Sequence, residues 1–316
     1  MAVLEAVCPA RDALAVFGHL VAHSLVSLID ADPRRYRLLE TVQRFADECR
    51  RGGDAPDVPV AAHARFYLEF VEARWPNGRI ATDVPWALLD AEMTEVVAAI
   101  EMASDRDPGL ARRLLGAVGW YWSLGGYAEQ CERLAERLST DHETDDAAVQ
   151  AAFLWARSNA RLLLGLDPVE PALRAHALAV EAASWSVAGW ALSHVIAPDM
   201  MWADLALVEA RWPEVVELFR RADDPLGEAW AMVFVRGWAE ACAQLHARAT
   251  ATYHEAAALF ERHGDDLGTA RALLEVVELN TWSGEDLDAA RAAFERVPRV
   301  EAASVDFRMK YEWLGG

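Results

Sequence analysis

The sequence predicts an all-α protein, a solenoid of helical hairpins preceded by a small element that contains one β-hairpin. Two observations carry this prediction. From about residue 61 onward the chain is rich in Ala, Leu, Glu and Arg, and apolar residues recur at three- and four-residue steps, the period of amphipathic helices. Segments of the chain also repeat at intervals of 34 to 41 residues, the length of one hairpin in a stacked helical array.

The first 51 residues are predicted to form a separate element. Residues 24–29 are β-prone, a turn follows, and residues 35–38 can return as a second short strand. Helices at 11–22 and 40–51 flank this hairpin. Residues 52–60 contain two glycines and two prolines and break all periodicity, so they are expected to be a linker to an array that spans 61–316.

The array itself is expected to consist of short antiparallel helices. Amphipathic patterns at 61–75 and 86–103 begin it. Turn signals rich in Gly, Pro, Asp and Asn then separate successive helices of roughly ten to twenty residues; these signals lie at 76–78, 107–109, 125–126, 167–168 and 264–265.

The repeats are visible when the sequence is aligned with itself. Residues 219–229 align without a gap on 260–270, and Phe260-Glu261-Arg262 matches Phe294-Glu295-Arg296 at an offset of 34. Such periods are typical of tetratricopeptide-like arrays. The alignment predicts that aromatic side chains plug between layers while small ones allow close approach; the aromatic residues are Phe219, Phe260 and Phe294, and the small ones are Ala229, Ala270 and Ala290.

Composition narrows the function classes. Thirty Lys and Arg against fifty Asp and Glu leave a net charge of −20, which argues against nucleic acid and anionic membrane as general partners. No uncharged apolar run is long enough for a membrane span, and the first ten residues lack the pattern of a secretory signal, so a cytoplasmic address is expected. Four cysteines without a C-x-x-C pair indicate reduced thiols and neither a disulfide frame nor a zinc site.

Motifs for catalysis and cofactor binding are missing from the sequence. The only lysine is Lys310, which no Gly-rich loop precedes, so the P-loop mechanism has no lysine to use. The common Gly-rich, nucleophile-elbow, zinc-helix and EF-hand signatures do not occur. His19 and His23 have the i, i+4 spacing of a metal pair but no third ligand, and the acidic residues at 141–146 read as a solvated loop. We therefore expect no cofactor, no metal and no enzymatic activity.

Tryptophan is abundant, with thirteen in the chain. An aromatic binding groove is one interpretation. Packing between layers is the other, and it is favoured because Trp190 and Trp230 fall at repeat-equivalent positions. The candidate groove residues are Trp120, Trp122, Trp155, Trp190 and Trp230.

Arginine is concentrated near the predicted hairpin. Seven arginines balance seven acids in residues 1–51, so the whole negative excess lies in the remainder. A contact with phosphate or with a partner is one interpretation of this cluster, and a solvated face is the favoured one. The residues concerned are Arg34, Arg35, Arg37 and Arg44.

These segments resemble a known class of bacterial regulator. Residues 20–26, followed after a turn by 35–46, closely resemble the end of the winged-helix element in STAND ATPase-type proteins, which include LuxR-family and antibiotic-regulatory-type transcriptional regulators and adenylate-cyclase-fused relatives. Residues 63–67, 86–103 and 114–126 resemble the segments that begin the tetratricopeptide-like sensor array of that family. The helix that contains Glu92-Met93-Thr94-Glu95 departs from the family pattern, which has an asparagine in place of Glu95.

The resemblance implies a function in regulation. It makes residues 1–51 a partial winged-helix element and the array a sensor arm that lacks the ATPase module. The leading hypothesis is a non-enzymatic module that binds a protein, peptide or small-molecule effector on the array. A DNA-contacting regulator that uses the winged-helix remnant is the alternative, and an enzyme is a third option with no motif behind it. A separate ATPase or DNA-binding module, or self-association through residues 1–51, would supply the missing parts.

Overall fold

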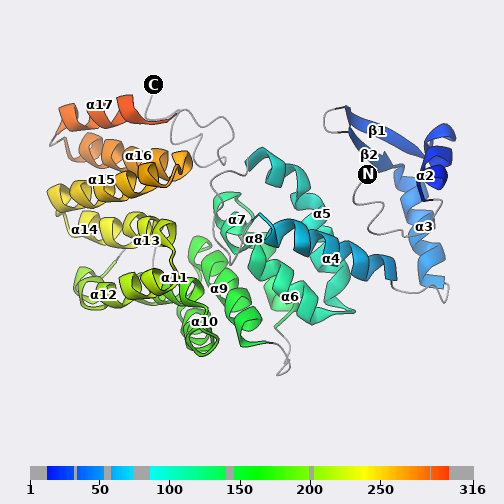
Figure 1. The fold of residues 1–316 in the computed structure, drawn as a ribbon, viewed down its shortest axis with the longest axis horizontal. Helices are drawn as coiled ribbons and strands as arrows, with labels where there is room; N and C mark the ends of the chain where they lie inside the picture. Colours follow the sequence, from blue (N-terminus) through cyan, green and yellow to red (C-terminus); the bar gives the residue numbers. More distant parts are fainter. Residues whose placement is uncertain are drawn as a thin grey trace. The chain divides into compact units, whose positions relative to one another are not determined.

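The computed structural model describes residues 13–31, 34–52, 58–74, 86–139, 146–198, 203–284 and 286–298. This part of the chain is helical apart from one two-stranded sheet, which confirms the predicted fold class (Figure 1). The chain divides into two compact units, residues 1–67 and 68–316. Within the described ranges, no helix combines the length and the apolarity that a membrane crossing requires.

The first unit contains the expected hairpin between two helices. Helix α2 (Ala13–Ala22) leads to β1 (Val26–Ala31), which pairs antiparallel with β2 (Arg34–Leu38) in a register that sets Val26 against Leu38. Helix α3 (Glu40–Gly52) follows. The first strand starts two residues later than predicted, because Ser24 adopts a left-handed φ of 57° and the amide of Leu25 donates to Leu20 O in the turn that ends α2.

Helix α4 (Val58–Glu72) covers the last three residues of the predicted linker. Pro59 is tolerated there because the first turn of a helix has no intrahelical acceptor for its missing N–H. Residues 53–57, the centre of that linker, lie outside the described part of the chain. The division between the two units falls inside α4, after Tyr67.

The second unit is a succession of helices in which each packs against its neighbours in the chain, most extensively α9 with α10, α10 with α11, α15 with α16 and α16 with α17 (Figure 1). A six-residue π-helix, η2, interrupts one of the hairpins. The elements are α5 (Trp86–Ser104), α6 (Pro108–Ala117), α7 (Gly119–Leu124), α8 (Ala128–Arg137), α9 (Ala147–Leu163), α10 (Val169–Glu181), α11 (Trp185–Ile196), α12 (Leu205–Arg221), α13 (Pro225–Ala231), η2 (Met232–Gly237), α14 (Trp238–Cys242), α15 (His246–Arg262), α16 (Asp266–Ser283) and α17 (Leu287–Arg296).

The aligned repeats share one local structure. Phe219 and Phe260 are fully buried at the ends of α12 and α15, and each ring lies against a glycine at the start of the next helix. A Cβ on Gly227 would stand 2.7 Å from the Phe219 ring, and one on Gly268 would stand 2.3 Å from the Phe260 ring. The predicted plug is therefore confirmed for these two layers.

The third repeat is looser at its aromatic position. Phe294 in α17 is only half-buried. The small residues of all three repeats are buried as predicted; Ala229 and Ala270 are fully buried and Ala290 is 6% exposed.

Candidate functional site

Four of the five candidate tryptophans meet in the second unit. Trp120 of α7 lies with its ring centroid 4.4 Å from that of Trp190 in α11, 5.9 Å from that of Trp155 in α9 and 6.0 Å from that of Trp230 in α13. Trp122 stands apart, and its indole N–H donates to Leu115 O at 3.1 Å. All five side chains are buried, with exposed fractions between 0% and 8%. They pack between layers, and Trp155 and Trp190 also line a cavity.

The candidate arginines lie in the first unit. Arg34 and Arg35 belong to β2, opposite Ala31 and Asp30, but their side chains fall outside the described ones. Arg37 is exposed, and the exposed Arg44 pairs with Glu40 at 2.7 Å.

Metal ligands do not gather in the described part of the chain. His19 and His23 are exposed. No group of three His, Cys, Asp or Glu side chains comes together there. The acidic residues at 141–145 lie outside the described ranges, and the last residue of that predicted loop, Asp146, is the N-cap of α9.

A cavity of about 830 Å³ opens within the second unit, between α6, α9, α11 and the end of α12. Small side chains create the space: Gly116, Ala117, Ala148, Ala152, Ala183 and Ala222 all line it. At two of these residues α6 and α9 approach closely, since a Cβ on Gly116 would stand only 3.0 Å from Ala152. Trp155 and Trp190 supply an aromatic wall.

Charged side chains line the same cavity. Arg113 of α6 donates from Nε and Nη2 to the two carboxylate oxygens of Glu72, at 2.7 and 2.9 Å, so both partners of this bidentate pair are engaged. Arg221 at the end of α12 is half-exposed and lies over the ring of Trp185, 5.3 Å from its centroid. It also donates from Nε to Glu217, which does not line the cavity.

The beginnings of two helices line the cavity as well. At α9, Asp146 accepts a hydrogen bond from the amide of Ala148 at 2.8 Å. At α11, the N-cap Ser184 makes no such bond with its side chain. The amides of Trp185, Ser186 and Val187 meet no acceptor among the described residues. The first turn of α11 therefore presents unpaired donors and the positive end of the helix dipole.

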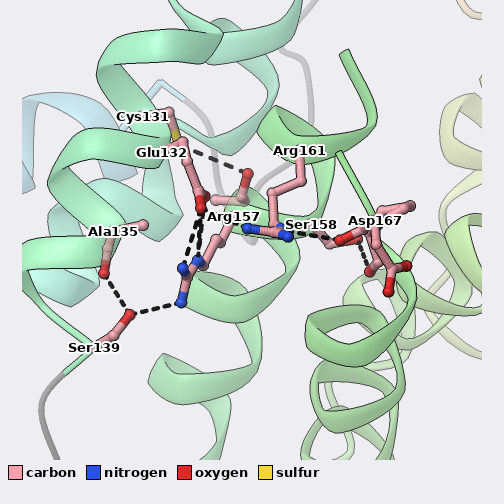
Figure 2. Close-up of polar contacts among 10 residues, drawn as sticks. Cys131, Glu132, Ala135, Ser139, Arg157, Ser158, Arg161 and Asp167 are labelled. Atoms are coloured by element: carbon pink, nitrogen blue, oxygen red, sulfur yellow. Dashed lines mark hydrogen bonds and ion pairs between the residues drawn. The ribbon is translucent and has the colours of Figure 1, made fainter. Parts of the chain in front are cut away.

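Beside the cavity-lining elements lies a half-buried ion network, drawn in Figure 2. Glu132 of α8 accepts from two arginines of α9, Arg157 at 3.1 Å and Arg161 at 2.8 Å. Arg157 also donates to Ser139 Oγ, and Arg161 donates to the carbonyl of Asp167 in the turn before α10. The network ties α8, α9 and this turn together, which assigns it a structural role.

A serine and a histidine meet in the core between α9 and α11. His194 Nδ1 lies 3.0 Å from Ser158 Oγ, and Ser158 donates to the carbonyl of Pro168 at 2.9 Å, so the histidine is the donor of the first bond. Burial lowers the pKa of His194 to about 4 and keeps the ring neutral at pH 7. Ser158 is fully buried and already donates its proton, so the pair is a packing contact.

Another buried nucleophile is equally inert. Burial raises the pKa of the Cys131 thiol, whose Sγ lies 3.7 Å from Ala156 O. A thiol kept protonated in this way is a poor nucleophile.

No protein-family model matches the chain, and no curated protein matches it in sequence. The resemblance to STAND-type regulators therefore stays a prediction from the quoted segments. Analysis of the sequence missed the cavity residues Arg113, Ser184 and Arg221. The signal that could have found them is the helix-cap pattern, because Ser184 stands where other helices of the array begin at an aspartate.

Proposed function

We propose that the helical array is a cytoplasmic, non-enzymatic regulatory or sensor module, similar in role to the sensor arm of STAND-type regulators, and that the cavity between α6, α9, α11 and α12 is its ligand site. One observation carries the proposal. The cavity, at about 830 Å³, falls within the roughly 300–1,000 Å³ typical of ligand sites, and it combines an aromatic wall with a few polar groups.

The chemistry of the lining favours binding over catalysis. Its guanidinium groups, amides and hydroxyls can hold and orient a ligand. The serine–histidine pair, Ser158 with His194, lies in the core and does not line the cavity, and the hydroxyl of the lining residue Ser186 donates to the buried Asp224. A module of this kind would pass on the presence of an effector through the packing of its layers.

A matched pair of variants tests the site. Ala148 is the second residue of α9 after its Asp146 cap and lines the cavity, whereas the exposed Ala206 occupies the same place in α12 after its Asp204 cap. Any metabolite or peptide that raises the unfolding midpoint of the wild type should fail to do so with Ala148→Trp and should still do so with Ala206→Trp. Equal loss in both variants, or in neither, would place the ligand elsewhere.

DNA contact through the first unit is the weaker proposal. It rests on the exposed Arg37 and on Arg34 and Arg35 in β2, while Arg44 already pairs with Glu40. Binding by these arginines would weaken as salt rises, because counterions compete for phosphate. An electrophoretic shift assay at two salt concentrations is expected to show no salt-sensitive complex.

Self-association through residues 1–51 is the partner proposal that the first unit supports. Large apolar side chains stand exposed on α2, on the hairpin and on α3. A second copy of the chain would cover them symmetrically.

A further inference from the structure

We infer that the cavity takes a neutral, flat aromatic ligand that accepts a hydrogen bond from the indole N–H of Trp190. The inference rests on the proposed function, because it names the chemical class of ligand for the cavity already proposed as the binding site. Three features of the lining point to this class: an unused indole donor, charges that are already paired, and aromatic walls.

The indole nitrogen of Trp190 is a donor that the described residues leave unused. The side chain lines the cavity and is more than nine-tenths buried, with an exposed fraction of 5%. Its Nε1 meets no hydrogen-bond acceptor in the part of the chain that the structure describes. Nε1 of Trp155 is closed off completely, whereas Nε1 of Trp190 can still be reached by a water molecule.

Neighbouring rings determine the side on which this N–H is open. Three rings surround Trp190, with centroids 4.4, 5.3 and 6.5 Å from its own; they belong to Trp120, Phe219 and Trp155. A side chain enclosed in this way keeps its access to solvent where it lines the cavity, so a ligand there can reach Nε1. A buried indole N–H normally has a hydrogen-bond partner. A ring nitrogen or carbonyl oxygen of a ligand would supply the missing acceptor.

The charged groups of the lining are already paired. Glu72 accepts from Arg113 with both carboxylate oxygens, and Asp146 caps α9. Arg221 donates to Glu217 and is half-exposed to water. A charged ligand would therefore have to displace an existing partner.

A carboxylate also lies at the first turn of α11. The hydroxyl of the lining residue Ser186 donates to Asp224, which is buried and accepts from the amide of Gly227 at 3.0 Å. An anion placed at this turn would be repelled by the Asp224 carboxylate at reduced dielectric. The lining therefore favours a neutral ligand.

The aromatic walls select the body of that ligand. Trp155 of α9 and Trp185 and Trp190 of α11 all line the cavity. Flat aromatic groups gain from stacked and edge-to-face contacts with such rings. The geometry therefore favours a flat aromatic body over a flexible aliphatic chain.

Three flat bicyclic compounds test the class: quinoline, indole and 1-naphthoate, each titrated at a pH where quinoline is neutral. Quinoline offers a ring nitrogen as acceptor, whereas indole offers only a donor, which would face the donor of Trp190. Quinoline should bind the wild type about fivefold more tightly than indole, the effect of one neutral hydrogen bond. 1-Naphthoate should bind more weakly than quinoline, because its charge finds no free partner in the lining.

Two matched substitutions test the donor. Trp190→Phe keeps an aromatic wall and removes the N–H, so it should weaken quinoline about fivefold and change the affinity for indole by less than about twofold. Trp155→Phe is the control, because Trp155 also lines the cavity but its Nε1 is closed off. That variant should bind quinoline within about twofold of the wild type.

An NMR measurement on the wild type tests the same bond without a substitution. Quinoline should move the indole proton signal of Trp190 downfield, as hydrogen bonding does, and should move it further than the signal of any other tryptophan. This result decides the question even where Trp190→Phe fails to fold.

The outcomes distinguish this inference from the proposal beneath it. If indole binds as tightly as quinoline and Ala148→Trp abolishes the binding of both, the cavity is a ligand site but the acceptor contact is wrong. If 1-naphthoate binds more tightly than quinoline, the neutral class is wrong. If Trp155→Phe weakens quinoline as much as Trp190→Phe does, or the Trp190 signal does not move, the assigned donor is wrong. If none of the three compounds binds the wild type, the inference fails, and the proposed function is then decided by the ligand screen with Ala148→Trp and Ala206→Trp.

Discussion

Individual aspartates and aromatic rings determine where the helices of the array begin and how closely its layers meet. Asp224 and Asp265 cap α13 and α16. Three residues after each aspartate stands a glycine, Gly227 or Gly268, and the ring of Phe219 or Phe260 packs against it. The eleven-residue repeat in the sequence contains the aromatic ring, the capping aspartate and the glycine of this local structure, so the packing of the ring between layers could be predicted from sequence alone. The cavity could not, because it arises from what small side chains leave empty between helices that are distant in sequence.

Phe260 offers the most direct test of this packing. Its side chain is fully buried, so Phe260→Ala should lower the free energy of unfolding by about 3–5 kcal/mol through lost burial and the cavity left behind. Urea unfolding measures the change. Phe45, 66% exposed in α3, is the matched control, and Phe45→Ala should change stability by less than about 0.5 kcal/mol. A similarly small loss of stability for Phe260→Ala would show that the ring is not buried in the core.

His194 makes the stability depend on pH. Its pKa is about 4 in the folded protein because of burial, against 6.5 for an unperturbed histidine. Below about pH 6.5, His194 therefore becomes protonated in the unfolded chain but stays neutral in the folded protein. The free energy of unfolding falls as the pH drops from 6.5 to 4, by about 3 kcal/mol in total. Above pH 6.5 both states are neutral and this group contributes no pH dependence.

A variant isolates the contribution of His194 from those of other titrating groups. Burial raises the pKa of Asp265 and of Glu228, so those carboxyls favour the folded state as the pH falls and partly offset the histidine. The loss of stability between pH 7 and pH 4.5 should therefore be smaller in His194→Gln than in the wild type, by about 2–3 kcal/mol. Equal slopes in the two proteins would show that the ring is not buried in its neutral form.

At the scale of the elements, several turns between helices contain one residue with a left-handed, positive φ, a conformation that costs free energy for any residue with a side chain. Gln244, between α14 and α15, has a left-handed φ of 60°, and Gly264, between α15 and α16, has a φ of 69° at the equivalent place. A glycine adopts this conformation without the steric cost that a side chain brings. Gly126 and Gly264 belong to turn signals that the sequence showed, whereas the turn at Gln244 carries no such signal.

This difference predicts opposite effects of exchanging the two residue types. Gln244→Gly should stabilise the protein by about 0.5–1 kcal/mol, and Gly264→Ala, although its Cβ would meet open space, should destabilise it by about 1 kcal/mol. Thermal unfolding of the two variants measures both. A loss of stability in Gln244→Gly would mean that the side chain holds the turn through a contact that outweighs its backbone strain.

The helical character of the array followed from apolar periodicity and turn residues, but its π-helix η2 did not. The hydrogen bonds of a π-helix span one residue more than those of an α-helix, a change too small for apolar periodicity to register over Met232–Gly237. Its last residue, Gly237, lies close to α15, where a Cβ on this glycine would stand 2.3 Å from the ring of Tyr253. The sequence predicted that the candidate tryptophans pack between layers. The packing around Trp120 in the structure shows which of them contact one another.

At the scale of the whole molecule, the two units differ in how far they bury their apolar side chains. The array buries nearly continuous layers, whereas Val26 is the buried hydrophobic residue of the described hairpin and its flanking helices, and α2 has no buried residue. The exposed large apolar residues of this region are Leu14, Val16, Val21, Leu28, Ile29, Leu38, Leu39 and Phe45. The net charge of −20 lies outside residues 1–51, so like-charge repulsion is weakest here, which favours contact between copies through this region.

We therefore expect the full chain to form dimers through the first unit at micromolar concentration, with the apolar side chains of α2, the hairpin and α3 covered by the same surface of a second copy. Sedimentation equilibrium should show the dimer for the wild type and a monomer for Leu28→Ser combined with Phe45→Ser, because that pair removes two of the most exposed apolar groups. Trp282→Ser in α16, where the side chain is 72% exposed on the array, is the control and should leave the dimer intact. Deletion of residues 1–55, which leaves α4 whole, should give a monomeric helical array. A wild type that stays monomeric at high micromolar concentration would overturn this expectation, and aggregation of the deletion variant would indicate that the first unit instead covers part of its own chain.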